Sequence, residues 1–306
     1  MRLLLARGAR QELQNKDGAS ALHRAAEEGH AGVVEQLCAA PGAASAVALC
    51  DKIGRTPLAL AVSSGGGSER LVAALLAADA AGVTVNAQDA GGDSALIAAS
   101  YNGHEDAVRL LLAGGVRQEL QDEHGMTALH CAAWKGHVGI VELLCAVPGA
   151  AAAVALRERL GRTPLVLAVA LSGGGERLVA ALLAADAACV ALDAQNDKGD
   201  SALIIASEKG HGDAVRLLLA RGARQELQNK VGASALHRAA EEGHADVVEQ
   251  LCSAPGAAAA VSLRVKNGNV PLALAVRAGH AAIATVLMRT ARGERGLNRD
   301  SALVAV

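Results

Sequence analysis

Residues 2–16, RLLLARGARQELQNK, recur without a change at residues 216–230, and a close variant, RLLLAGGVRQELQDE, occupies residues 109–123. Successive copies are therefore 107 residues apart. Such a fixed period indicates that one unit of architecture was duplicated in tandem. We expect an array of repeats that stack on their neighbours and present an extended surface.

Each 107-residue unit divides further into three smaller repeats. A skeleton of Gly, any residue, usually Ser or Thr, Ala or Pro, and Leu recurs with its glycine at positions 18, 54, 92, 125, 161, 199, 232 and 268. Each copy predicts two short helices and an extended link. The first helix begins after a capping residue such as Ser20 or Thr127, and Pro57 suits a first helical turn. A Gly-His pair such as Gly103-His104 marks the reversal.

The motif at the start of the first helix identifies a family resemblance. It reads Ser20-Ala-Leu-His-Arg-Ala25, Thr127-Ala-Leu-His-Cys-Ala132 and Ser234-Ala-Leu-His-Arg-Ala239, and more loosely Thr56-Pro-Leu-Ala59 and Thr163-Pro-Leu-Val166. This pattern resembles that of ankyrin-repeat proteins along the whole chain. The resemblance implies an all-α repeat solenoid of stacked helix-turn-helix ankyrin repeats with short β-hairpin links, grouped here in 107-residue triplets.

The repeats are expected to form one array over residues 1–306. Met1 stands where Val108 and Val215 stand in later copies, and Asp300–Val306 resembles Asp93–Ala99, so both ends match half repeats. Because solenoid ends usually carry polar caps, we expect a fragment of a longer array or of a multidomain protein. The expected boundaries are a half repeat at 1–14, full repeats at 15–50, 51–88, 89–121, 122–157, 158–195, 196–228, 229–264 and 265–298, and a half repeat at 299–306.

Two insertions recur in every triplet. Glycine-rich segments at 64–69 and 172–176 replace the Gly-His turn, and a Pro-Gly pair follows the second helix at 41–42, 148–149 and 255–256. Both kinds of insertion are expected to be surface loops along one side of the stack.

The composition excludes several partners. A net charge of −2 provides no basic footprint for nucleic acid. The longest apolar stretch, residues 143–156, is shorter than the roughly 18 residues that cross a bilayer. The first residues lack the apolar core of a secretory signal. We therefore expect no nucleic-acid binding and no membrane insertion.

Cysteine and histidine spacing predicts no metal, no cofactor and no disulfide. Cys38, Cys145 and Cys252 are 107 residues apart, so they cannot meet, and Cys50, Cys131 and Cys189 are isolated. Reduced thiols suggest an intracellular protein, cytoplasmic or nuclear. Nine of the ten histidines occupy two skeleton positions, in the first helix and after the turn glycine, and the resemblance implies that they bond backbone groups of adjacent repeats.

The sequence contains no nucleophile motif and no phosphate-binding motif. The glycine runs lack the Lys-Ser/Thr of a phosphate-binding loop, and there is no Gly-x-Ser-x-Gly elbow. The adjacent acidic pairs Glu27-Glu28 and Glu241-Glu242 are interpreted as a solvated helix end rather than as paired catalytic carboxylates. The chain is not expected to be an enzyme.

The resemblance implies that partners dock on the concave face, on hairpin tips and on the exposed ends of the first helices. There Tyr101-Asn102 and Trp134-Lys135 stand in adjacent repeats, where other copies carry Glu208-Lys209 and Glu241-Glu242. Tyr and Trp often dominate interface energies. We predict a partner-binding patch of Tyr101, Asn102, Trp134 and Lys135, extended by His124 and Met126. The alternative is that the rings lie on their neighbours without any partner.

These observations favour a non-catalytic scaffold or adaptor that binds a protein partner of unidentified type. A second hypothesis is a targeting or regulatory segment of a larger enzyme or multidomain protein. A third is a structural spacer or a self-associating array, in which uncapped terminal repeats stack end to end.

Overall fold

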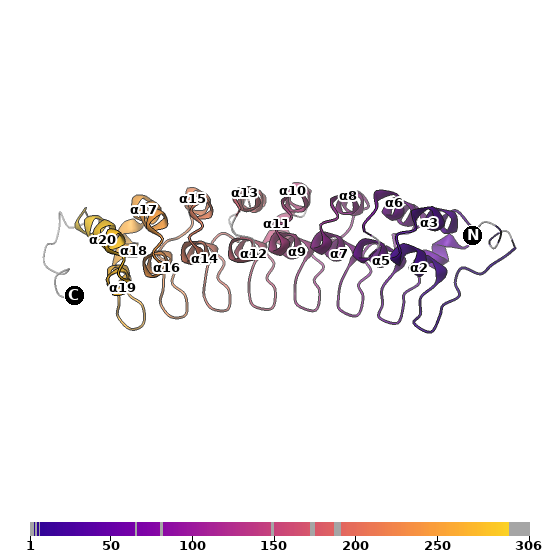
Figure 1. Ribbon diagram of the computed structural model, residues 1–306, viewed down its shortest axis with the longest axis horizontal. Helices are drawn as coiled ribbons and strands as arrows, with labels where there is room; N and C mark the ends of the chain where they lie inside the picture. Colours follow the sequence, from indigo (N-terminus) through magenta and orange to yellow (C-terminus); the bar gives the residue numbers. More distant parts are fainter. Residues whose placement is uncertain are drawn as a thin grey trace. The chain divides into compact units, whose positions relative to one another are not determined.

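The computed structural model describes residues 3, 5, 7–64, 66–79, 82–147, 150–171, 175–186 and 191–293. These residues form helices joined by turns and by hairpin-shaped links, which confirms the all-α repeat fold (Figure 1). The links are not regular β-hairpins, because the described residues contain only one isolated bridge, between Gln88 and Ser94. The chain divides into two compact units, unit 1 at residues 1–159 and unit 2 at residues 160–306.

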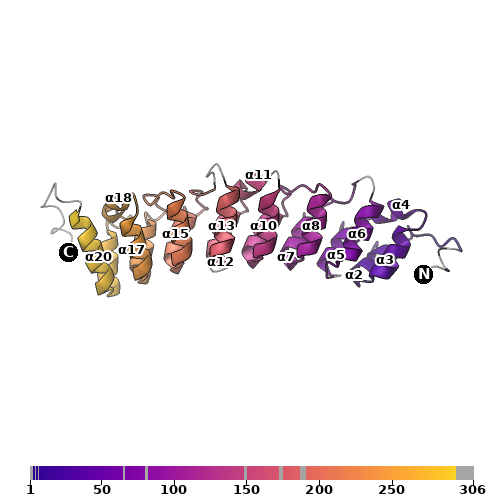
Figure 2. The ribbon, with the colours of Figure 1, turned by 90° about the horizontal axis from the view of Figure 1, so that it is seen from above.

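Unit 1 consists of two layers of helices. The inner helices α2, α5, α7 and α9 pack on one another in order, and so do the outer helices α3, α6, α8 and α10 (Figures 1 and 2). The inner helices are α2 (Ala21–Glu27), α5 (Pro57–Ser63), α7 (Ala95–Asn102) and α9 (Ala128–Lys135), and the outer ones are α3 (Ala31–Cys38), α6 (Glu69–Ala78), α8 (Glu105–Ala113) and α10 (Val138–Ala146).

Unit 2 repeats this arrangement. Its inner helices are α12 (Pro164–Leu171), α14 (Ala202–Lys209), α16 (Ala235–Glu242) and α19 (Pro271–Ala278), and its outer helices are α13 (Glu176–Ala185), α15 (Gly212–Ala220), α17 (Ala245–Ser253) and α20 (Ala281–Gly293). In each layer, successive helices pack against each other. The half repeat expected at 299–306 lies outside the described residues, and the single array with its repeat boundaries stays a prediction.

A serine or threonine cap and a histidine three residues later define the start of several inner helices. In α2, the Ser20 backbone N–H donates to His23 Nδ1 at 3.2 Å, while the His23 N–H donates to Ser20 Oγ at 3.4 Å. The reciprocal bonds satisfy two of the backbone donors that a helix N-terminus leaves open. Thr127 with His130 forms the same arrangement in α9.

The same histidines join one repeat to the next. The second ring nitrogen of His23 lies 3.1 Å from the Arg55 carbonyl oxygen, and that of His237 lies 3.4 Å from the Asn269 carbonyl oxygen. Since Nδ1 accepts the cap N–H, Nε2 carries the proton and donates to the carbonyl of the following repeat. The expectation that these histidines bond backbone groups of adjacent repeats is confirmed.

A glycine ends most inner helices where the next repeat leaves no room for a side chain. Gly243 has φ 87°, and a Cβ atom there would lie 2.6 Å from His280 Cε1. The His280 ring is held in this place by a 3.2 Å hydrogen bond to the Glu241 carbonyl oxygen. Both the left-handed backbone and the close imidazole therefore require glycine.

The glycine-rich segment of unit 1 also contains a glycine that lies against a histidine of the next repeat. Gly67 is buried, and a Cβ atom there would overlap the imidazole of His104 in the next repeat. Ser64 and Gly66 are exposed, as a surface loop requires. Residue 65 and residues 172–174 of the second segment lie outside the described residues.

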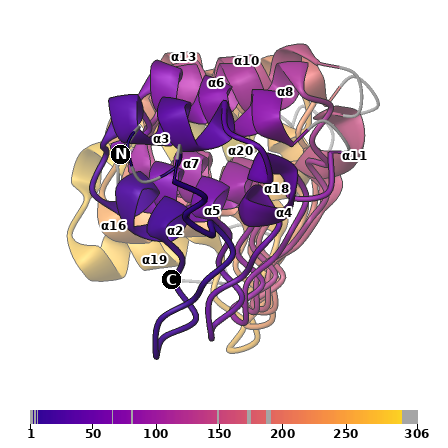
Figure 3. The ribbon, with the colours of Figure 1, turned by 90° about the vertical axis from the view of Figure 1, so that its right-hand side faces the viewer.

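The Pro-Gly insertions are followed by short helices, which corrects the expectation of plain surface loops. These are α4 (Ala43–Val47) and α11 (Ala150–Ala155) in unit 1 and α18 (Ala257–Ser262) in unit 2. Figures 2 and 3 show α4 and α11 along the same side of unit 1. The alanine-rich sequence favours helix, and each short helix buries one face, as Ala46 and Val47 do in α4. Pro148-Gly149 itself lies outside the described residues.

A buried glutamine fastens two of these insertions to the preceding link. Gln11 Nε2 donates to the Pro41 carbonyl oxygen at 3.0 Å, and Gln225 Nε2 donates to that of Pro255 at 2.8 Å. Both glutamines belong to the duplicated stretch with which the sequence begins. The repetition of this stretch therefore preserves a contact between repeats.

Small aliphatic side chains fill the space between the layers. The largest fully buried residues include Leu22, Leu96, Leu129 and Ile140, and alanines such as Ala132 are completely buried beside them. Alanine allows helices to approach closely, which explains how the chain builds a core without phenylalanine. Among the described helices, none has both the length and the apolar character needed to cross a membrane.

Replacing the turn glycine of α16 should destabilise unit 2 more than replacing a turn glycine in open space. Gly222 has φ 84°, and a Cβ atom there would meet nothing within 4 Å, whereas Gly243 has a similar φ and the nearby His280 ring. Gly222→Ala should cost about 1–2 kcal/mol of backbone strain, and Gly243→Ala roughly 1 kcal/mol more, because of overpacking. Urea denaturation followed by circular dichroism measures both; equal losses would contradict the contribution of the imidazole contact.

Acidification should destabilise the protein in the range where free histidine titrates. Burial lowers the pKa of His23 and of His237 below the ordinary value of 6.5. The unfolded chain then binds more protons than the folded chain, so the free energy of unfolding decreases as the pH falls through about 6.5 toward 5. Urea midpoints across this range measure the effect, and His237→Gln should make the dependence shallower. A midpoint that rises on acidification would refute the assignment.

Candidate functional site

The two aromatic residues occupy equivalent places at the ends of neighbouring inner helices. Tyr101 lies in the last turn of α7 and Trp134 in the last turn of α9, and these two helices pack directly on each other. Their positions are set by the caps Ser94 and Thr127, both seven residues earlier. Tyr101 is 40% exposed and Trp134 is 38% exposed. Each ring therefore retains a substantial accessible surface.

The two rings contact each other and form one patch. Their centroids are 5.9 Å apart, with an interplanar angle of 66°, which is an edge-to-face arrangement. Such pairs are stabilised by about 0.5–1.5 kcal/mol beyond the burial of their area. The structure thus brings together the two residues that the sequence places one repeat apart.

Lys135 lies over both rings. Its ammonium nitrogen is 4.2 Å from the Tyr101 centroid and 5.1 Å from the Trp134 centroid. An ammonium group over an aromatic face is attracted by the negative face of the ring. Lys135 therefore gives this end of the surface a positive charge and restricts the movement of the rings.

Asn102 has mainly a local structural contact. Its side-chain nitrogen donates to the Ala98 carbonyl oxygen at 2.9 Å and reaches the Val62 carbonyl oxygen of the preceding repeat at 3.5 Å. The residue is nevertheless exposed. Its amide oxygen is the part that a partner would meet.

The hairpin residues predicted to extend the patch differ from each other. His124 is exposed at the tip, and its Nε2 lies 3.7 Å from Glu123 Oε1. Met126 is only 8% exposed, which corrects the expectation that its side chain adds to the accessible patch. Met126 directly precedes the cap Thr127, where the link returns to the body of the repeat and turns its side chain inward.

Sequence reasoning missed a group of carboxylates on the hairpins that lead into α7 and α9, at the opposite ends of these helices from the aromatic pair. We call Asp89, Asp93, Asp122 and Glu123 the acidic hairpin cluster. Asp89 Oδ1 accepts the Gly91 and Asp93 backbone N–H groups at 2.9 Å each, so the loop turns around this carboxylate. Comparing the hairpins position by position in the sequence would have revealed the cluster, because acidic residues replace basic or amide residues there.

The preceding hairpin contains an ion pair that the acidic hairpin cluster lacks. In that hairpin Asp51 Oδ2 is 2.8 Å from Arg55, four residues later. Asp93 stands four residues after Asp89, at the place of this arginine. Among the described residues, no Lys or Arg forms an ion pair with Asp89, Asp93 or Asp122.

The negative charges of the acidic hairpin cluster act on Asp93. Partial burial, followed by the charges of Asp89, Asp122 and Glu123, raises the pKa of its carboxyl above the ordinary value. A raised carboxyl pKa means that the charged form lacks sufficient compensation. The hairpin end of this surface is therefore negative, and the aromatic end is positive at Lys135.

The described residues contain no group of three or more His, Cys, Asp or Glu side chains able to hold a metal ion. Burial raises the pKa of the Cys38 and Cys145 thiols to about 11, and burial together with Asp122 and Asp93 raises the pKa of Cys131 to about 12. Thiols of this kind are poor nucleophiles.

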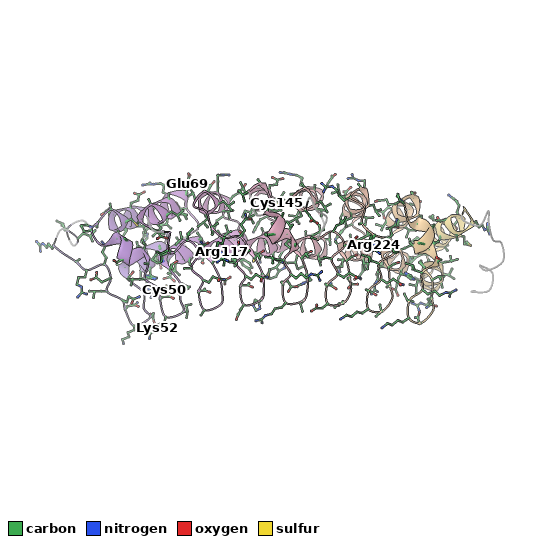
Figure 4. All side chains as sticks on the ribbon, turned by 180° about the vertical axis from the view of Figure 1, so that it is seen from behind. Cys50, Lys52, Glu69, Arg117, Cys145 and Arg224 are labelled. Carbon is green, nitrogen blue, oxygen red and sulfur yellow. The ribbon has the colours of Figure 1, made fainter. Side chains whose placement is uncertain are left out.

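The described cysteines are also free of disulfides, as the spacing predicts. In Figure 4, Cys50 lies beside a hairpin of unit 1, whereas Cys145 lies on the outer helices. Cys189 lies outside the described residues. The predicted absence of a cofactor stays a prediction.

Comparison with known proteins identifies the family. A family model described as "Ankyrin repeats (3 copies)" matches residues 1–89, 66–155, 150–229 and 222–298. A search among curated proteins found no match. The matches extend over nearly the whole sequence and agree with the paired helices, the capping histidines and the turn glycines. The chain belongs to the ankyrin-repeat family.

Proposed function

We propose that this protein is a non-catalytic scaffold that binds a protein partner through the concave face of unit 1, formed by the hairpins and the exposed ends of the inner helices. Ankyrin repeats are generally protein–protein interaction modules and typically not catalytic. The observation that supports this site is the exposed edge-to-face pair of Tyr101 and Trp134, with Lys135 over both rings.

The equivalent positions of unit 2 carry other side chains than Tyr and Trp. Equivalent places in unit 2 carry Glu208 and Glu241, whose partly exposed carboxylates lie near Arg238, at 3.5 Å and 3.4 Å. The repeat therefore does not require an aromatic residue there. Aromatic rings left partly exposed offer a partner a large rigid area to desolvate.

His124 and Asn102 border this surface, and Lys135 adds a charge that orients a partner. Met126 contributes through the shape of the hairpin, because its side chain is buried. An intracellular location, expected from the cysteine spacing, is part of the proposal.

The proposal is tested by converting the patch to the sequence of unit 2. We expect Tyr101→Glu with Trp134→Glu to reduce capture of specific partners at least about tenfold, or ~1.4 kcal/mol, because the aromatic contact area is removed. The measurement is affinity capture by the full chain from cell extract, quantified by mass spectrometry for wild type and variant in parallel.

The matched control is Met288→Ala. Met288 is a 41% exposed apolar residue on α20 in unit 2, so its replacement removes exposed apolar area elsewhere. Circular dichroism and thermal melting establish that both variants remain folded. If every captured protein is retained equally by the wild type and the double variant, the aromatic pair is not the binding site.

A further inference from the structure

The acidic hairpin cluster carries carboxylates where its copy in unit 2 carries amide or basic side chains. Asp89, Asp122 and Glu123 stand at the positions of Asn196, Asn229 and Lys230, and only Asp93 keeps an aspartate, as Asp200. In unit 2, Asp200 Oδ1 accepts a 2.7 Å hydrogen bond from Asn229 Nδ2 of the following hairpin. Both residues are more than nine-tenths buried. The residues 107 positions earlier are Asp93 and Asp122. The same pair of positions therefore holds an aspartate and an amide in unit 2, but two carboxylates in unit 1.

The two copies also differ in exposure. Asp200 is 8% exposed against its amide partner, whereas Asp93 is an exposed residue. Two neighbouring carboxylates repel each other. When both are ionised, neither has a proton to donate to the other in a hydrogen bond. Asp93 is exposed as a residue, so an outside donor can reach its carboxylate.

The described part of the chain does not supply that donor itself. Asp122 Oδ1 accepts the backbone N–H groups of His124 and Met126 at 2.8 Å and 2.7 Å, which fixes the carboxylate in the turn. The basic group that acts on the charge of Asp93 is His124, whose own contact is with Glu123. Lys135 is held over the aromatic rings at the other end of α9.

The acidic hairpin cluster and the aromatic pair are separated by about the length of one inner helix. Asp93 directly precedes the cap of α7, and Tyr101 lies eight residues later, so the two are separated by about 12 Å along the helix at 1.5 Å per residue. An extended peptide covers this distance with about four residues. One short segment of a partner can therefore reach both ends of the surface.

We infer that the partner of the Tyr101–Trp134 site is a protein segment that places a Lys or Arg side chain between Asp93 and Asp122 and an apolar side chain on the aromatic pair, about four residues apart. This inference depends on the proposed function of that site. The basic side chain supplies the donors that Asn229 supplies in unit 2. A guanidinium group fits best, because its N–H groups engage two carboxylates at once.

A peptide segment uses both parts of the surface. The described residues of the cluster do not form a group able to hold a metal ion. The aromatic pair, at the other end of the inner helices, suits an apolar side chain.

The test uses random peptides displayed on phage and selected against the full chain in low salt. The peptides have about 12 residues, which is three times the span of the site. Selected peptides should contain Arg or Lys about four residues from a large apolar residue. When they are resynthesised, replacing the basic residue by citrulline or norleucine should weaken binding about tenfold. Raising the salt concentration should weaken binding of the original peptide but not of the neutral one.

The central variant is Asp122→Asn, which introduces the amide that unit 2 carries as Asn229. It should fold, because the side-chain oxygen of Asn229 accepts the same two turn N–H groups, at 3.1 Å and 2.9 Å. The added amide should bond Asp93 and weaken the basic peptides about tenfold. Asp93→Arg should abolish binding, because an arginine at that place would pair with Asp89 as Arg55 pairs with Asp51.

The outcomes separate this inference from the proposed function. Peptides that are lost on Tyr101→Glu with Trp134→Glu but retained by Asp122→Asn leave the site in place and overturn its preference for a basic partner. Peptides that are lost on Asp122→Asn but retained by the aromatic double variant overturn the joint site. Selection of peptides without Arg or Lys also overturns the inference, and loss with both variants supports it.

Discussion

The interaction on which the stack depends is the hydrogen bond from a buried imidazole to the backbone of the next repeat. His23 accepts its own cap N–H and donates to the Arg55 carbonyl, so one neutral ring serves a helix start and a repeat boundary together. After the turn glycine, another histidine reaches back to the preceding repeat, as His244 does to the Glu208 carbonyl at 3.0 Å. A change in register would break both sets of bonds, and this constraint keeps the repeats aligned.

This regular frame leaves only a few positions free to vary. In the last turn of the inner helices and at the tips of the hairpins, backbone groups make the contacts between repeats, as the Glu208 carbonyl and the Glu123 N–H do. The side chains at these places can therefore follow the needs of a partner. Unit 2 fills the helix ends with Glu208 and Glu241, and unit 1 fills them with Tyr101 and Trp134. The departures from the repeat, rather than the repeat itself, therefore mark the candidate site.

The duplicated units also act as internal controls for electrostatics. Asp200 is buried and accepts a hydrogen bond from Asn229, whereas Asp93 is exposed and has the carboxylate of Asp122 at the position of Asn229. The amide of Asn229 supplies a donor within unit 2, and a carboxylate at the same position in unit 1 leaves the pair open to an outside cation. Such a comparison is available only because both copies lie in one chain.

The sequence by itself determined the paired helices, their starts and reversals, the structural histidines and the neighbourhood of Tyr101 and Trp134, because caps, turn glycines and repeat register act locally or between adjacent copies. Only the tertiary structure decided the features that depend on packing. The alanines after each Pro-Gly pair form a helix because they find an outer helix to pack on, and Met126 turns inward at the return of its hairpin. Lys135 lies over both rings, and the acidic hairpin cluster lacks a cation among the described residues, because side chains from two repeats converge there. Contacts of this kind depend on distances between side chains of different repeats, which a pattern along one chain does not contain.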